Sequence, residues 1–151
     1  SYYQPEVGKA AVRLLEAAGF EVILAERRVC CGRPMISKGM LREAKKNARI
    51  NASLLAPYAR TGIPVVGTEP SCVLTFRDEY PDLLPGDEDA AVLAKNSYLL
   101  DEFLFGAAGD VMSLMKWKPD AENVLYHVHC HQRAMTGTGA PVGLLEIAGC
   151  G

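Results

Sequence analysis

The residues of this chain with the clearest chemical potential are two adjacent cysteines. Cys30 and Cys31 are followed by Gly32 and Pro34, which predict a turn that brings backbone amides near the two sulfur atoms. Adjacent thiols point in different directions, so they could bind two metal ions of one cluster or one metal ion each. Thiolates are the usual ligands of iron–sulfur clusters. The alternative is that both cysteines are small hydrophobic residues at the end of a strand.

Two further cysteines stand in motifs of their own. Cys72 follows Pro70 in the first turn of a predicted helix, where the helix N-terminus is expected to lower the pKa of the thiol. An inert buried cysteine is the alternative. Cys130 lies between His129 and His131, and all three histidines of the chain fall within five residues. This clustering predicts a site role for one of these residues, although no pair has the spacing usual for zinc.

The remaining candidates have simpler interpretations. Cys150 stands near the chain end and is predicted to be structural. Glu69 precedes Pro70 and predicts a helix cap, with a carboxylate near a metal ion as the alternative. Arg33 and Arg77 are predicted to be solvated charges beside the cysteine motifs.

Alternating helices and strands are expected to position these residues. Strands are predicted at 20–25, 63–66 and 124–128, and helices at 5–19, 38–60, 70–80, 92–103 and 141–148, with one or two helical turns at 110–117. Pro57 is expected to kink the second helix or to end it early. The alternation predicts an α/β fold, in which a parallel sheet is flanked by helices in a Rossmann-like arrangement.

Four cysteines occupy equivalent places in this pattern. Cys30, Cys31, Cys72 and Cys130 each follow a predicted strand and precede a predicted helix. The carboxyl ends of parallel strands lie along one edge of a sheet, and α/β folds bind their ligands there. We therefore expect these four cysteines to converge on one crevice.

Composition narrows the possible classes of protein. The 151 residues are 49% hydrophobic and carry a net charge of −2, which fits one domain with its own core and predicts no nucleic-acid partner. No apolar run approaches the ~20 residues that span a bilayer, and no signal peptide opens the chain. Together with the unpaired cysteines, this suggests a reducing, cytoplasmic setting, either free or at the inner face of the membrane.

The motifs, taken in order, resemble those of the cysteine-rich CCG domain. They are Cys30-Cys31-Gly32-Arg33-Pro34, Glu69-Pro70-Ser71-Cys72, Tyr80-Pro81-Asp82-Leu83-Leu84 and His127-Val128-His129-Cys130-His131. The domain recurs in the iron–sulfur subunits of glycolate oxidase and anaerobic glycerol-3-phosphate dehydrogenase, in lactate-utilisation proteins and in the B subunit of heterodisulfide reductase. Large FAD-linked oxidases similar to D-lactate dehydrogenases carry it at their C-terminal end, and the resemblance implies that this chain is a fragment of such a protein.

The resemblance implies a duplicated domain, with a first copy at 1–84, connecting helices at 85–118 and the start of a second copy at 119–151. It implies that an iron–sulfur cluster, of the 4Fe–4S type, is bound by Cys30, Cys31, Cys72 and Cys130. Residues around these ligands would support them: Gly32, Pro34, Glu69, His129 and His131. No catalytic residue is expected. An early cysteine and a second Cys-Cys-Gly are absent, so we expect a fragment of a longer polypeptide whose site is incomplete, either metal-free or partly loaded.

Three functions are compatible with these residues. The first is electron transfer in a flavin-linked oxidoreductase acting on glycerol 3-phosphate or on a 2-hydroxy acid such as glycolate or lactate. FAD would lie in a partner domain or subunit, and quinone or a membrane-associated protein would accept the electrons. The second is thiol–disulfide chemistry at a cluster, against which Glu69 argues because it replaces a ligand cysteine. The third is a metal-free docking module for partner subunits, and a zinc site is a smaller alternative.

Overall fold

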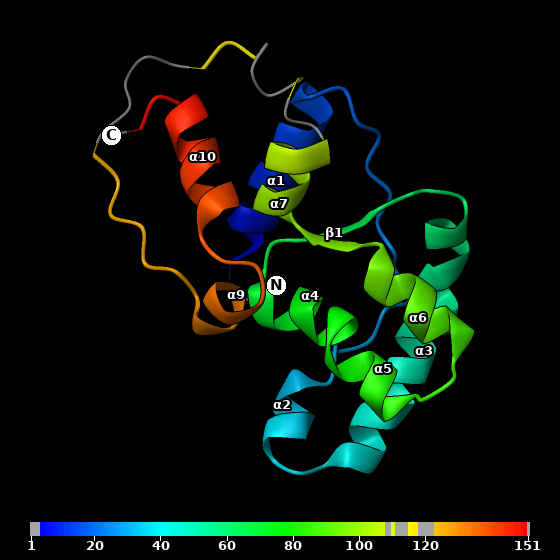
Figure 1. The fold of residues 1–151 in the computed structure, drawn as a ribbon. Helices are drawn as coiled ribbons and strands as arrows, with labels where there is room; N and C mark the ends of the chain where they lie inside the picture. Colours follow the sequence, from blue (N-terminus) through cyan, green and yellow to red (C-terminus); the bar gives the residue numbers. More distant parts are fainter. Residues whose placement is uncertain (1–3, 108–109, 111–114, 118–122, 151) are drawn as a thin grey trace. The chain divides into compact units, whose positions relative to one another are not determined.

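The computed structural model describes residues 4–107, 110, 115–117 and 123–150, and the chain divides into two compact units (Figure 1). One unit consists of residues 24–99. The other combines residues 1–23 with residues 100–151. Each unit is considered by itself.

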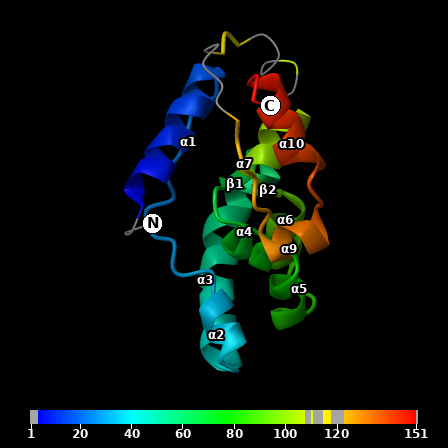
Figure 2. The ribbon, with the colours of Figure 1, turned by 90° about the vertical axis from the view of Figure 1, so that its left-hand side faces the viewer.

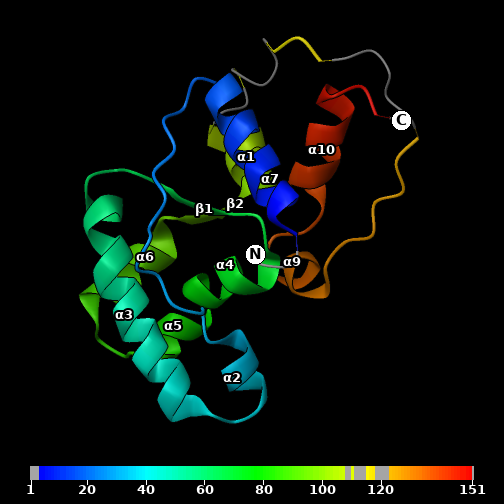
Figure 3. The ribbon, with the colours of Figure 1, turned by 180° about the vertical axis from the view of Figure 1, so that it is seen from behind.

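The 24–99 unit is organised around its long helix α3 (Leu41–Arg60). The buried face of this helix consists mostly of small side chains: Ala44, Ala48, Ala52, Leu55, Ala56 and Ala59. Short side chains let a neighbouring helix approach closely, and α6 (Glu88–Lys95) packs along this face. Figure 3 shows α2 (Arg33–Ser37), α4 (Pro70–Arg77) and α5 (Glu79–Leu83) gathered beside the same helix.

Two short parallel strands complete this unit. β1 (Val65–Gly67) pairs with β2 (Ser97–Leu99), with Val65 opposite Ser97. The chain between them forms α4, α5 and α6, as a parallel pair requires a long crossover. A Cβ atom on Gly67 would overlap the side chain of Val73, so the glycine allows α4 to pack directly against β1.

The other unit is helical in its described parts. It contains α1 (Pro5–Ala17), α7 (Leu100–Glu102), the π-helix η1 (Phe103–Ala107), α9 (Cys130–Met135) and α10 (Gly139–Ile147). The ring of Phe20 packs edge-on against Phe103, with the centroids 5.1 Å apart. Helix α10 contacts α7 and η1 (Figure 2), and Gly143 lies so close to Phe105 that a Cβ atom would overlap the ring.

The strand predictions at 20–25 and 124–128 are wrong. Neither segment pairs with another strand in the described part of the chain, and both leave apolar side chains in solvent: Leu24 is 68% exposed and Leu125 is 97% exposed. A strand exists only where a neighbour accepts its hydrogen bonds. Conversely, residues 97–99 were predicted within a helix but form β2, because β1 provides that neighbour.

The helix predictions are mostly confirmed, with shifted ends. Helix α1 ends at Ala17, and Gly19 follows it at φ +87°, where a glycine avoids the steric cost of the left-handed conformation. Helix α3 continues through Pro57 to Arg60. The proline has no N–H group to donate to the carbonyl of Ser53, four residues earlier. The helix tolerates this loss because Ser53 and Pro57 are both exposed to solvent.

Three other segments differ from their predictions. The single helix predicted over 70–80 is two helices, α4 and α5, and Pro81 lies in the first turn of α5, where no backbone N–H is needed. Residues 33–37 form the short helix α2 directly after Gly32, where only a turn was predicted. The helical turns predicted at 110–117 lie largely outside the described residues. The last helix, predicted at 141–148, is α10 at Gly139–Ile147.

The fold is therefore α/β with parallel strands, as predicted, but it is mostly helical. The described residues contain two strands, so a Rossmann-like sheet covered by helices on both faces is not confirmed. Among the described residues, no helix is both long enough and apolar enough to cross a membrane.

Candidate functional site

The adjacent cysteines lie where an extended segment turns into α2. Gly32 caps this helix at φ +96°, a left-handed conformation that strains any residue with a Cβ atom. Its carbonyl oxygen accepts hydrogen bonds from the N–H groups of Met35 and Ile36. Cys31 is buried and Cys30 is exposed. The predicted turn is confirmed, and it places one of the two thiols inside the unit and the other at its surface.

Cys72 is held in place at the N-terminus of α4. Pro70 occupies the first turn of the helix, and the carboxylate of Glu69 accepts a hydrogen bond from the backbone N–H of Cys72 over 2.6 Å. The predicted capping role of Glu69 is therefore confirmed. Because the carboxylate binds the N–H of Cys72 itself, it places a negative charge beside the thiol.

Cys31 and Cys72 meet although 41 positions separate them. Their sulfur atoms lie 3.3 Å apart, within hydrogen-bond distance. The hydrogen bond shared with Cys72, together with those from the N–H of Arg33 and the thiol of Cys30, lowers the pKa of Cys31 to about 6, although burial opposes this. At neutral pH the pair therefore carries one negative charge, centred on the sulfur of Cys31.

The expectation that the helix N-terminus lowers the pKa of Cys72 is wrong. The pKa of this thiol is raised, first by its hydrogen bond to Cys31 and further by partial burial and the negative charges of Cys31 and Glu69. These nearby charges outweigh a helix terminus, whose effect is typically 0.3–1 kcal/mol. The asymmetry assigns the thiolate to Cys31 and the proton to Cys72.

The sequence reasoning missed two buried polar residues behind the cysteine loop. Asn51 on α3 and Tyr80 on α5 are both 0% exposed. The amide of Asn51 bonds to Val29, to the carbonyl of Cys30 and to the phenol of Tyr80, which in turn donates to the carbonyl of Cys31. A detectable signal existed for Asn51, since it interrupts the otherwise apolar positions of the buried face of α3.

Tyr80 keeps its proton in this position. Burial raises the pKa of its phenol, and the negative charges of the cysteines add to this effect, although the hydrogen bond from Asn51 acts in the opposite direction. The phenol therefore remains a hydrogen-bond donor to Cys31 over the physiological pH range.

A charged pair ties the same loop to α5. Arg33, which follows Gly32, forms an ion pair with Glu79, the residue before Tyr80. The prediction that Arg33 is only a solvated charge is therefore wrong. Arg77, the second arginine predicted to be solvated, is half-buried at the end of α4.

Cys130 lies in the other unit, at the start of α9. The imidazole of His129 caps this helix by accepting a hydrogen bond from the N–H of His131 over 3.2 Å. Cys130 is exposed, and both histidines are half-buried. Since Cys130 belongs to one unit and Cys30, Cys31 and Cys72 belong to the other, the convergence of these four cysteines in one crevice stays a prediction.

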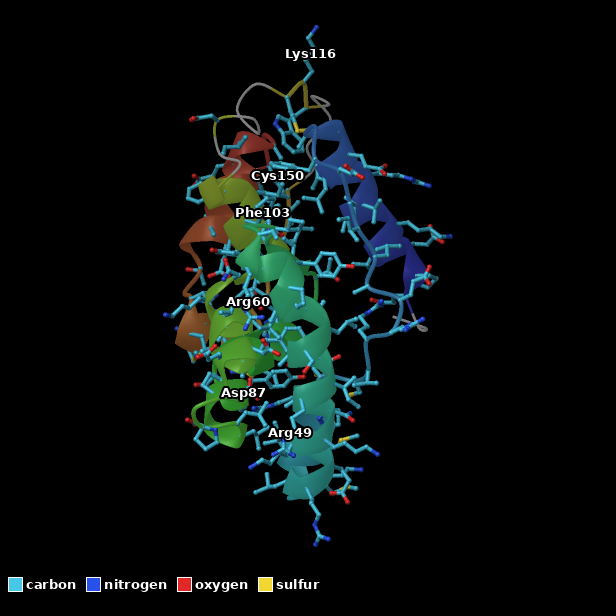
Figure 4. The ribbon with its side chains drawn as sticks, turned by 90° about the vertical axis from the view of Figure 1, so that its right-hand side faces the viewer. Arg49, Arg60, Asp87, Phe103, Lys116 and Cys150 are labelled. Atoms are coloured by element: carbon cyan, nitrogen blue, oxygen red, sulfur yellow. The ribbon has the colours of Figure 1, made fainter. Side chains whose placement is uncertain are left out.

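Polar side chains hold α9 within its unit. Gln132 is buried and donates to the carboxylate of Asp101 over 2.6 Å, and it accepts a hydrogen bond from the phenol of Tyr126. Cys150 (Figure 4) follows α10 in the same unit. Its N–H donates a hydrogen bond to the carbonyl of Leu145. This backbone contact is compatible with the structural role predicted for Cys150.

Comparison with known proteins identifies the family of the cysteine motifs. Residues 1–77, which include Cys30, Cys31 and Cys72, match the family described as CCG, a cysteine-rich domain. No solved structure matches the chain.

The chain is also similar to curated bacterial proteins. It is 33% identical to the C subunit of the anaerobic glycerol-3-phosphate dehydrogenase of Escherichia coli K12, covering 97% of this chain and 36% of that protein. It is 37% identical to lactate utilization protein A of Oceanobacillus iheyensis, covering 93% of this chain and 57% of that protein. It is 38% identical to lactate utilization protein A of Bacillus pumilus, covering 95% of this chain and 59% of that protein. The chain thus spans between about a third and three fifths of the length of these relatives.

Proposed function

Because this chain belongs to the CCG family of cysteine-rich domains, we propose that it is an iron–sulfur-binding electron-transfer domain of an oxidoreductase. One observation carries the proposal. The thiols of Cys31 and Cys72 lie 3.3 Å apart, with Cys30 next to Cys31 in the chain, and all three cysteines fall within the residues that match the family. Thiolates from separate loops that meet at one point are the ligands that iron–sulfur clusters require.

The donor set fits such a group. Two thiolates bound to one tetrahedral metal ion at about 2.3 Å lie about 3.8 Å apart, so the observed pair would separate by ~0.5 Å to share one iron atom, and by more to bind two iron atoms of one cluster. Because the pKa of Cys31 is lowered to about 6, this ligand is already a thiolate at neutral pH. Cys30 is exposed beside this pair and provides a third sulfur. Cys130 is the candidate for a further ligand.

A bound cluster would accept and release single electrons. Two residues of this chain would hold it, Cys31 as a buried ligand and Cys72 as an exposed ligand in the first turn of α4. Gly32 would contribute by forming the turn, and Glu69 by capping α4. Pro34 in α2 is proposed to support Cys31, and His129 and His131 at the start of α9 are proposed to support Cys130.

The names of the relatives suggest the substrate class. We propose that the whole protein oxidises glycerol 3-phosphate or a 2-hydroxy acid such as lactate or glycolate, since its relatives are a glycerol-3-phosphate dehydrogenase subunit and lactate utilization proteins. Substrate oxidation would occur at FAD in a partner domain or subunit. The electrons would then pass through this domain to quinone or to a membrane-associated acceptor, on the cytoplasmic side.

Anaerobic reconstitution with iron and sulfide tests the metal assignment. We expect the chain to bind iron and, after reduction with dithionite, to give an electron paramagnetic resonance signal of an iron–sulfur cluster. Cys31→Ser and Cys72→Ser should each lose most of the iron, whereas Cys150→Ser should retain it. Absence of bound iron in the unsubstituted chain would favour the metal-free docking module, and zinc bound in preference to iron would also contradict the proposal.

A further inference from the structure

The backbone of the cysteine loop is held from behind by a buried polar network. Asn51 on α3 and Tyr80 on α5 are 0% exposed, and the two side chains are joined by a hydrogen bond of 2.9 Å. An apolar side chain would fill either position at lower cost, because a buried amide or phenol must find hydrogen-bond partners. Nearly all of the partners of these two groups are backbone atoms of the cysteine loop.

Asn51 takes the place of a strand neighbour for Val29. Its Oδ1 atom accepts from the N–H of Val29 over 3.0 Å, and its Nδ2 atom donates to the carbonyl of the same residue over 3.2 Å. A paired strand would satisfy both groups of one residue in this way. The segment before the cysteines has no strand partner among the described residues, so the side-chain amide fixes an extended backbone that would otherwise be unpaired.

The next two carbonyl groups are held in the same network. Nδ2 of Asn51 lies 3.4 Å from the carbonyl oxygen of Cys30, which also accepts from Asn47 over 3.1 Å. The phenol of Tyr80 donates to the carbonyl oxygen of Cys31 over 3.0 Å. Three successive carbonyl groups are therefore bound by α3 and α5, while the sulfur of Cys31 lies beside Cys72 on α4.

We propose that Asn51 and Tyr80 are positioning residues of the cysteine site, which hold the backbone of Cys30 and Cys31 so that the thiol of Cys31 meets the thiol of Cys72. This inference rests on the proposed function for its biological meaning, since a preset pair of thiols is what a metal cluster needs. Its physical content is independent of any metal: the network sets how closely two thiols approach.

The closeness of two thiols is measurable as an effective concentration. A parent chain carrying Cys30→Ser, Cys130→Ser and Cys150→Ser retains only Cys31 and Cys72. In a buffer of reduced and oxidised glutathione, the two thiols lose two electrons and two protons and form a disulfide, while one oxidised glutathione becomes two reduced molecules. The ratio of disulfide to dithiol, read by mass spectrometry after acid quenching, gives the effective concentration.

Tyr80→Phe is the informative variant, because it removes one oxygen atom and keeps the ring that packs against Phe76. We expect it to lower the effective concentration of the two thiols about fivefold, as the loss of one hydrogen bond predicts. Asn51→Ala should lower it at least as much, and it provides a second test if the tyrosine variant fails to fold.

Ser97→Ala is the matched control. Ser97 is also buried in this unit, and its hydroxyl donates to a backbone carbonyl, that of Leu93, over 2.7 Å. Ser97→Ala should lower the free energy of unfolding but change the effective concentration of the two thiols by less than twofold. The proposal is overturned if the effective concentration of the two thiols in Tyr80→Phe and Asn51→Ala, confirmed as folded, stays within twofold of that in the parent chain. It is also overturned if Ser97→Ala lowers the effective concentration as much as these two variants do. Since no metal is present, these outcomes do not depend on whether a cluster forms.

Discussion

The phenol of Tyr80 donates a hydrogen bond to the carbonyl oxygen of Cys31 over 3.0 Å, although the two residues are 49 positions apart. The preceding residue, Glu79, forms the ion pair with Arg33. One short helix, α5, thus contacts both sides of Gly32, where the loop turns. The geometry of the cysteine loop therefore depends on α5 as much as on the Cys-Cys-Gly motif itself.

The pH dependence of thiol reactivity follows from the shared proton of Cys31 and Cys72. In the metal-free chain, alkylation of Cys31 by iodoacetamide should rise with pH around a midpoint of about 6, because the pKa of this thiol is lowered from 9.0. Peptide mass spectrometry at each pH identifies the alkylated residue. Cys72→Ala removes the hydrogen bond that is the largest cause of the shift, so the midpoint should move upward. A midpoint near 9 in the unsubstituted chain would contradict this assignment.

The same shift makes the stability of the 24–99 unit depend on pH. The unfolded thiol binds its proton more tightly than the folded one, so folding is favoured increasingly as pH rises between about 6 and 9. The contribution of Cys31 is complete above about pH 9 and is lost as the pH falls through about 6. Urea unfolding at several pH values measures it, and Cys31→Ala should flatten this part of the profile.

Gly32→Ala should affect both stability and the cysteine site. The left-handed backbone at φ +96° costs an alanine roughly 1–2 kcal/mol in the free energy of folding, although its Cβ atom would meet Ala44 only at ordinary contact distance. Gly62→Ala is the matched control, because Gly62 lies in the same unit at φ +84° with no atom near its Cβ position. Both variants should lose similar stability in urea. Only Gly32→Ala should change the alkylation midpoint of Cys31, and an equal shift in Gly62→Ala would contradict a local effect.

Glu69 should influence the site through two separable properties. Glu69→Ala removes the helix cap and should lower stability by about 1 kcal/mol. Glu69→Gln keeps an acceptor for the N–H of Cys72 but removes the negative charge, which raises the pKa values of Cys31 and Cys72. The alkylation midpoint of Cys31 should therefore be lower in Glu69→Gln than in the unsubstituted chain.

Asp87 provides the control for this charge effect. Its carboxylate caps α6 by accepting a hydrogen bond from the N–H of Ala90 over 3.0 Å. Asp87→Ala should cost about as much stability as Glu69→Ala, again about 1 kcal/mol. Asp87→Asn should leave the alkylation midpoint of Cys31 unchanged. If the midpoint moved equally in Asp87→Asn and Glu69→Gln, a specific effect of Glu69 on the thiols would be excluded.

The Arg33–Glu79 pair should be worth more than the exposed pair Lys9–Glu6. The side chain of Glu79 is 15% exposed, whereas that of Glu6 is 74% exposed. A double-mutant cycle with alanine, measured by urea unfolding, should give a coupling energy near 1 kcal/mol for the first pair and a few tenths for the second. Equal coupling energies in the two cycles would show that Arg33 does not anchor the loop.

The sequence by itself determined the local features, because each depends on neighbours within a few residues. Pro5 and Gly19 bound the first helix, Glu69 caps the helix that carries Cys72, and Gly32 turns the chain after the cysteine pair. The residue types also predicted the kind of ligand site, since thiolates are specific to few cofactors.

Only the tertiary structure decided which segments pair and which cysteines meet. Residues 20–25 were predicted as a strand but have no strand neighbour in the described part of the chain, whereas residues 97–99 were predicted as helix and form a strand because β1 lies beside them. The contact of Cys31 with Cys72 and the bonds of Asn51 and Tyr80 to the loop join residues 21 to 49 positions apart. Hydrogen bonds between distant segments form only when packing brings their partners together. The pattern of residues therefore led us to expect convergence of the cysteines, but it did not predict which pair meets or that Asn51 and Tyr80 bind the loop.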